Sequence, residues 1–337
     1  MNRGQFVCIT ACLLAGTFAS ARAQASDDAP ASAYRQSRDD AWWTGPILAA
    51  GANTLPKGHA LVEPYVFNVM GRGRYDANGT RHSAPRSHSY GSLTYLLYGL
   101  VDDFTVGVIP RFGYNDVTNA PDSSGVGLGD FTLQAAYQLA RYRDGEHTPS
   151  ISLVLQETLP TGKYDRLGSR ASDGIGSGAN TTTLSLYSQY FLWMPNGRIM
   201  RTRLNFSYAL SDTVSVEDAS VYGTASGFRG HAKPGSAFTV GSAWEYSVTR
   251  NWVLALDIVY EHHRNTTLRG FAPAAAPNAP PTNVRENFGS SELYTLAPAV
   301  EYNWNSQVGV IVGTVFTAAG RNTSANVIPV AALNMVF

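Results

Sequence analysis

The last part of the chain, from Leu293 to Phe337, carries an alternation of side chains that few folds accommodate. In its first segment every second residue is apolar, with aromatic rings near both ends, and the residues between are small or polar. The apolar set is Tyr294, Leu296, Pro298, Val300, Tyr302 and Trp304. A soluble sandwich would turn such a face toward its core without needing rings at the ends, whereas a membrane-barrel strand faces lipid and carries rings at both interfaces. The pattern therefore favours a transmembrane β-strand.

The same alternation continues to the end of the chain, after a predicted turn at Asn305-Ser306. The apolar positions are Val308, Val310, Val312, Thr314 and Phe316, followed by Pro329, Ala331, Leu333, Met335 and Phe337. A terminal strand that ends on an aromatic residue resembles the assembly signal of bacterial outer-membrane barrels. We therefore predict that Phe337 is part of an assembly signal, and that the partners of the chain include the barrel-assembly machinery and outer-membrane lipid.

An export signal is predicted over residues 1–23. A positively charged start is followed by an apolar stretch from Phe6 to Phe18 and by small residues before a cleavage site. Both cysteines of the chain, Cys8 and Cys12, lie inside this segment, so the mature chain is predicted to have no thiol and no disulfide.

The composition excludes some classes of protein. Charged residues make up only 15% of the chain, yet no stretch after the signal approaches the ~18 apolar residues that a membrane helix needs. A helical membrane protein is therefore excluded. The chain has 25 basic and 25 acidic residues, and the signal removes only basic ones, so the mature chain is slightly acidic. We expect no nucleic-acid partner.

Alternating segments recur along the chain from residue 60, and we predict a strand at each. They lie at about 60–70, 90–101, 103–114, 129–141, 149–160, 182–193, 201–211, 237–248, 251–262, 292–304, 307–317 and 327–337. An even number of about twelve strands suits a single-chain bacterial barrel. The connections alternate between tight turns and longer segments rich in Gly, Pro, Ser and Asn. This alternation predicts short periplasmic turns, long extracellular loops and two periplasmic termini.

The predicted fold is thus all-β: a transmembrane antiparallel β-barrel of about twelve strands over residues 60–337, in the bacterial outer membrane. Two segments, 90–101 and 182–193, carry apolar residues on both faces, so the pattern does not fix their register. The loop around Ala272 to Pro281, rich in Ala and Pro, is predicted to be a flexible loop crest.

Residues 24–59 show no sustained periodicity and form a predicted irregular segment. This segment contains Trp42, Trp43 and the pair Leu55-Pro56, and indole rings are costly to leave in water. We therefore predict that these residues form a plug, lodged in or against the periplasmic mouth of the barrel.

Six charged residues fall opposite apolar, lipid-facing positions, so the alternation directs them into the lumen. They are Arg111, Arg201, Arg203, Glu245, Asp257 and Glu301. Arg201 and Arg203 begin one segment and Glu245 ends the next, which places them at the same level and allows them to pair. Two interpretations remain open: a salt-bridge lattice that braces a narrow lumen, or a polar constriction that selects permeants by charge and size.

Other motifs predict no catalytic, cofactor or metal site. The run Glu261-His262-His263 could suggest a metal site, but neighbouring residues of a strand point to opposite faces, so a solvated rim is expected. A lipid-modifying barrel enzyme would need a serine and a histidine within hydrogen-bond reach. The residues available for such a pair in the first long loop are His82, Ser83, His88 and Ser89.

Several short motifs follow one another in order along the mature chain. They are Trp43-Thr44-Gly45-Pro46, Asn53 to His59, Glu63-Pro64-Tyr65, Gly127 to Asp130, Leu159 to Tyr164, Ala299 to Asn303 and Gly320-Arg321-Asn322. Together they resemble the outer-membrane transporters grouped under the meta-pathway of phenol degradation. The resemblance implies a barrel that passes small, often aromatic or hydrophobic, compounds and has no catalytic residues. We expect a passive channel for a small-molecule permeant, with a lipid-modifying barrel enzyme or a structural or adhesive barrel as alternatives.

Overall fold

A computed structural model describes residues 35–274 and 280–337. The predicted signal peptide, residues 1–23, lies outside the described residues. In the part of the chain that is described, no helix is long and apolar enough to cross a membrane. The two helical turns, η1 (Arg38–Asp40) and η2 (Ala171–Asp173), are short 3-10 turns.

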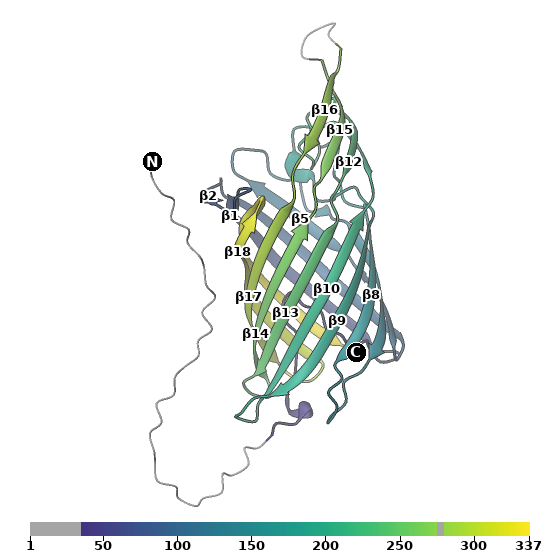
Figure 1. The fold of residues 1–337 in the computed structure, drawn as a ribbon, viewed down its shortest axis with the longest axis vertical. Coiled ribbons are helices and arrows are strands. Elements are labelled where there is room, and N and C mark those ends of the chain that lie inside the picture. Colours follow the sequence, from purple (N-terminus) through teal and green to yellow (C-terminus); the bar gives the residue numbers. More distant parts are fainter. Residues whose placement is uncertain (1–34, 275–279) are drawn as a thin grey trace, which may run out of the picture. The chain divides into compact units, whose positions relative to one another are not determined.

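Twelve antiparallel strands close into a barrel, because the first strand pairs with both the second and the last (Figure 1). The strands are β1 (Ala60–Tyr75), β3 (Ser87–Val101), β4 (Phe104–Ile109) continued by β5 (Arg111–Val117), β7 (Phe131–Ala140), β8 (Ser150–Leu159), β9 (Thr181–Trp193), β10 (Ile199–Ser211), β13 (Ala237–Ser247), β14 (Trp252–His263), β17 (Ser291–Asn303), β18 (Val308–Arg321) and β19 (Thr323–Val336). Pro110 separates β4 from β5, since proline has no N–H to give to the ladder. Each predicted segment falls on one of these strands, so the predicted fold is confirmed.

The connections differ at the two ends of the barrel. One end has tight turns, such as the two residues between β3 and β4, and most connections at the other end are long. The last hairpin is an exception, because Asn322 alone joins β18 to β19 in a left-handed conformation (φ 48°) that asparagine tolerates. The expectation of a longer connection there, between residues 317 and 327, was wrong, because both strands continue beyond their apolar stretches.

A second sheet stands at the long-loop end, built from β11 (Val214–Glu217), β12 (Arg229–Lys233), β15 (Thr267–Ala272) and β16 (Thr282–Asn287). Two further short strands, β2 (Arg81–His82) and β6 (Gly127–Leu128), extend the barrel sheet. We call the four-stranded sheet the cap sheet. The sequence had predicted only irregular loops there. The predicted loop crest around Ala272 to Pro281 includes residues outside the described part of the chain. Ala272 is the last residue of β15, and Pro281 directly precedes β16.

The outward face of the barrel is apolar and bounded by aromatic rings, as predicted. Near the tight-turn end the ring of Trp252 lies 4.7 Å from that of Tyr302, and near the other end Tyr260 lies 4.9 Å from Tyr294. These two rows match the aromatic girdles of membrane barrels. The structure also fixes the register of β9: Leu184 faces outward, whereas its neighbours at every second position from Ser185 face the lumen.

Phe337 lies at the seam where the barrel closes. Its backbone N–H donates to the carbonyl of Ala60 (2.8 Å), and the Ala60 N–H donates to the carbonyl of Phe337 (3.0 Å). Its side chain, on the outward-facing side of the alternation, is 65% exposed. We expect deletion of Phe337 to leave the chain exported but poorly inserted, measured as lost heat-modifiable migration of the membrane fraction. Phe337→Asp keeps the backbone and tests the ring alone; unchanged insertion of both variants would contradict the predicted assembly signal.

Candidate functional site

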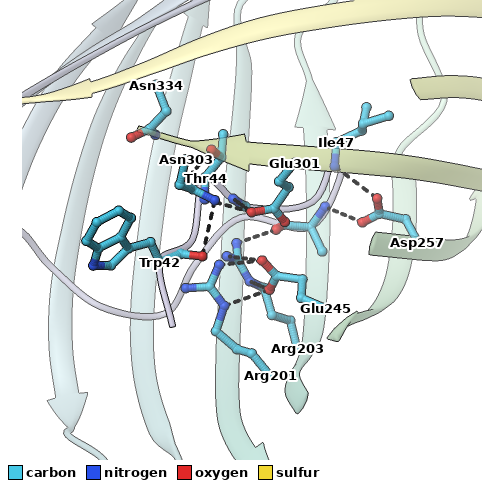
Figure 2. A network of polar contacts seen from close by, with 12 residues as sticks. Trp42, Thr44, Ile47, Arg201, Arg203, Glu245, Asp257, Glu301, Asn303 and Asn334 are labelled. Atoms are coloured by element: carbon cyan, nitrogen blue, oxygen red, sulfur yellow. Dashed lines mark hydrogen bonds and ion pairs between the residues drawn. The ribbon is translucent and has the colours of Figure 1, made fainter. Parts of the chain in front are cut away.

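An irregular segment, residues 35–59, runs into the lumen of the barrel, and we call it the luminal segment. It enters at the tight-turn end, contacts β17, β14 and β10 on one side of the lumen, and crosses to β7 and β4 before β1 begins. Figure 2 shows the first of these contact regions. Because this backbone belongs to no sheet, its buried polar groups need side-chain partners.

Two buried carboxylates accept backbone N–H groups of the luminal segment (Figure 2). Glu301 Oε2 accepts from Thr44 (2.7 Å) and Gly45 (3.1 Å). Asp257 accepts from Ile47 through Oδ2 (3.0 Å) and from Ala49 through Oδ1 (2.9 Å). Both carboxylates are fully buried, and hydrogen bonds to charged groups are among the stronger ones in proteins. The two carboxylates therefore anchor the segment at four successive points.

A buried ion-pair cluster adjoins these anchors. Nε of Arg201 donates to Glu245 Oε2 (2.7 Å), and Nε of Arg203 donates to the same oxygen (3.0 Å). Arg203 also donates to the carbonyl of Ala49 (2.7 Å), so the cluster holds the luminal segment directly. The guanidinium of Arg201 stacks 4.6 Å from the ring centre of Trp43, in a cation–π contact.

The structure thus brings together five of the six predicted luminal charges and leaves Arg111 apart. The sequence suggested either a salt-bridge lattice or a polar constriction for these charges. Neither interpretation included the role seen here, in which the charged side chains hold the luminal segment. Glu301 Oε1 is buried and has no hydrogen-bond partner among the described residues.

Uncharged side chains form the opposite anchor, which the sequence analysis missed. The N–H of Thr54 donates to Gln138 Oε1 (2.8 Å), and the N–H of Leu55 donates to Thr105 Oγ1 (2.8 Å). Gln138 and Thr105 are both buried. Their inward position follows from the alternation, but no pattern separates them from other small polar residues of the lumen.

The predicted plug residues lie at the margins of the segment. Trp42 and Trp43 are half-buried, with the Trp43 ring 6.4 Å from Phe191, whereas Pro56 is exposed at the mouth. The deeply buried residues are small ones, such as Thr44 and Gly45. Gly45 has φ 119°, and a Cβ there would lie 3.3 Å from the Arg203 guanidinium, so only glycine fits this crossing.

One wall of the lumen is apolar. On β1, β3, β18 and β19 many inward residues are large and apolar, such as Phe67, Leu93 and Val315, beside smaller or polar ones. The expectation of a small or polar inner face was therefore wrong at these apolar positions. With the tip of the luminal segment, this wall forms a cavity of about 350 Å³. Its lining residues are Ile47, Leu48, Tyr65, Phe67, Val69, Leu93, Tyr95, Arg111, Val315, Ile328 and Val330. An adjacent cavity of about 220 Å³ shares Ile47, Leu48, Tyr65 and Tyr95.

The histidines predicted at possible enzyme or metal positions have other partners. His82 pairs with Asp76 (2.8 Å), and His88 contacts the amide of Asn68 (3.1 Å). His263 pairs with Glu261 (3.2 Å). None of the described residues form a group of three or more potential metal ligands.

Comparisons with known proteins give one family and one fold. A family model described as "Putative MetA-pathway of phenol degradation" matches residues 51–326. No curated protein matches the chain. An outer membrane channel from Pseudomonas putida F1 is 16% identical, with a TM-score of 0.64 over 86% of this chain and 100% of that one. The toluene transporter TodX of Pseudomonas putida is 12% identical, with a TM-score of 0.39 over 88% and 95%.

Proposed function

The chain belongs to the family of the MetA-pathway of phenol degradation, and on that premise we propose that it is a passive outer-membrane channel for small apolar compounds, including single-ring aromatics. Its fold is that of an outer-membrane barrel. We further propose that both termini and the tight turns are periplasmic, because single-chain bacterial barrels have this arrangement.

The observation that carries the proposal is the apolar cavity beside the luminal segment. Its volume of about 350 Å³ falls within the range of small-ligand sites, and among its described lining residues Arg111 alone is charged. An aromatic ring of the permeant that packs against Phe67 and Val330 would be removed from water. The Arg111 guanidinium could then donate a hydrogen bond to a hydroxyl oxygen on the ring. This arrangement suits a phenol better than a sugar.

We infer that the luminal segment acts as a plug that must move for a compound to pass. It lines both cavities and is held by side-chain anchors on both sides of the lumen. Such a segment can shift between docked and released populations without unfolding the barrel.

A lipid-modifying enzyme is less well supported. Such an enzyme needs a serine close to a histidine. Among the residues that the structure describes, Ser215 Oγ lies 3.4 Å from His231 Nδ1, on an exposed face of the cap sheet. No carboxylate among the described hydrogen-bond partners of His231 orients its ring, which the chemistry of an activated serine requires. A purely structural or adhesive barrel would have no use for an apolar luminal cavity.

The channel proposal predicts faster uptake of phenols by cells that make the protein than by cells that lack it. Uptake of a sugar of similar size should not change, because the cavity wall offers it few polar partners. Val330→Asp, which places a charge in the cavity, should slow phenol uptake. Thr239→Asp adds the same charge on the inward face of β13, outside the cavity, and serves as control. Equal phenol uptake with and without the protein would refute the proposal.

A further inference from the structure

The two faces of the cap sheet differ in chemistry. One face is apolar and packs against loop residues, with Val216, Ala232 and Leu268 fully or almost fully buried around Phe228. Tyr164 and Ala179, from the connection between β8 and β9, pack against the same cluster. Because those loop residues cover one face of the sheet, its other face points away from them toward solvent.

That second face is strongly basic. Its exposed residues at alternate positions include four cationic side chains and a histidine, which we call the basic face: Arg229, His231, Lys233, Arg269 and Arg285. The acidic residue on this face, Glu217, is already paired with Arg166 (2.7 Å) from a loop. Phe271, next to Arg229 in the register, is also exposed.

Two arginines of the basic face lie directly opposite each other. Arg269 is the cross-strand partner of Arg285 on one side and of His231 on the other. Like charges in directly opposed positions destabilise a sheet. No ion pair joins Arg229, Lys233, Arg269 or Arg285 to an acidic side chain within residues 35–274 and 280–337. Glu217 lies opposite Arg229 but pairs with Arg166 instead, and the pair Arg269 and Arg285 has no acidic partner among the described residues.

The basic face stands just beyond the membrane. In Figure 1 the cap sheet stands beyond the upper ends of β13 and β14. β12 leads into β13 beside the exposed Phe238, and β14 leads into β15 beyond Tyr260 of the aromatic girdle. Lys233 precedes Phe238 by five residues, at most about 16 Å along an extended chain. In an outer membrane with the long loops outside, this height is that of the sugars and phosphate groups of lipopolysaccharide.

We propose that the basic face binds the phosphorylated core of lipopolysaccharide in the leaflet around the barrel. Guanidinium groups bind phosphate oxygens with paired hydrogen bonds, and a phosphate between Arg269 and Arg285 would replace their repulsion with two attractions. The inference rests on the proposed orientation of the barrel and not on the identity of the permeant.

The test is a titration of the purified mature chain, in non-ionic detergent, with fluorescently labelled lipopolysaccharide. The double variant Arg269→Gln with Arg285→Gln should bind about 10- to 30-fold more weakly, as expected for the loss of two cations at an anionic surface. Raising the salt concentration should weaken binding by the native chain, since exposed charges are screened. The double variant should keep its heat-modifiable migration and its uptake of phenol.

A matched control removes two exposed arginines from another loop at the same end, as Arg81→Gln with Arg86→Gln, and should bind normally. Equal binding of lipopolysaccharide stripped of its phosphates would overturn the proposal. So would equal losses in the two double variants, or no binding by the native chain.

A separate measurement tests the orientation on which the inference rests. The mature chain is predicted to have no cysteine, so Asn283→Cys on the basic face would give a single thiol. A membrane-impermeant maleimide should label it on intact cells. Labelling without lipopolysaccharide binding would overturn this inference and leave the channel proposal standing, whereas no labelling would overturn the orientation and this inference with it.

Discussion

Replacing Leu256 with arginine should keep most of the chain from inserting into the outer membrane. Leu256 lies on the outward face of β14, between Trp252 in one aromatic girdle and Tyr260 in the other, and is 38% exposed. A charge on the lipid face near the midplane costs about 2–4 kcal/mol, a large fraction of the stability of an ordinary fold. The measurement is the share of membrane-bound chain that shows heat-modifiable migration, compared with the native chain.

The control for this variant is one residue away. Asp257 is fully buried on the lumen side, where it accepts the N–H groups of Ile47 and Ala49. Asp257→Asn keeps one acceptor oxygen and meets no lipid, so the barrel should insert even if the luminal segment is held less firmly. Equal loss of insertion in both variants would mean that β14 does not face lipid as the structure places it.

The barrel could be predicted from the sequence because lipid imposes one requirement on every strand. Residues such as Leu254 and Val300 must be apolar at alternate positions wherever a strand crosses, and a one-residue slip would expose the other face. The strand count and the outward face follow from that single rule. The rule was sufficient even for β9, which was predicted as a strand although apolar residues occur on both of its faces.

The features that the sequence did not predict lie where the strands and loops do not contact lipid. The inward face carries no uniform rule, so the apolar wall around Phe67 and Val330 was missed. The cap-sheet strands are only four to six residues long, too short for a clear alternation among Gly and Ser residues. The anchors at Asp257 and Gln138 bind backbone N–H groups, which every residue except proline has, so no sequence pattern marks their partners.

Removing the chain between the export signal and Asn53 should leave an assembled barrel with a much larger conductance. The deletion takes away the four N–H groups held by Glu301 and Asp257, but no strand of the barrel. Water that enters the lumen can hydrate the freed carboxylates, and Glu245 keeps its two arginine partners. Single-channel recordings in planar bilayers should show larger or longer openings than the native chain gives.

Deletion alone cannot separate the volume of the segment from its anchoring, so a variant of full length is needed. Asp257→Ala with Glu301→Ala removes four of the hydrogen bonds that hold the segment, each worth about 1.5–3 kcal/mol when one partner is charged. Openings should become more frequent, and Trp43 should leave its place against Arg201. In a background without the other tryptophans, its emission should then shift to the red. The control variant is Glu261→Ala, which lies on β14 like Asp257 but pairs with His263. It should change neither the opening frequency nor the emission of Trp43. If the double variant is as closed as the native chain, the two carboxylates do not hold the plug, and the anchors at Gln138 and Thr105 must be enough.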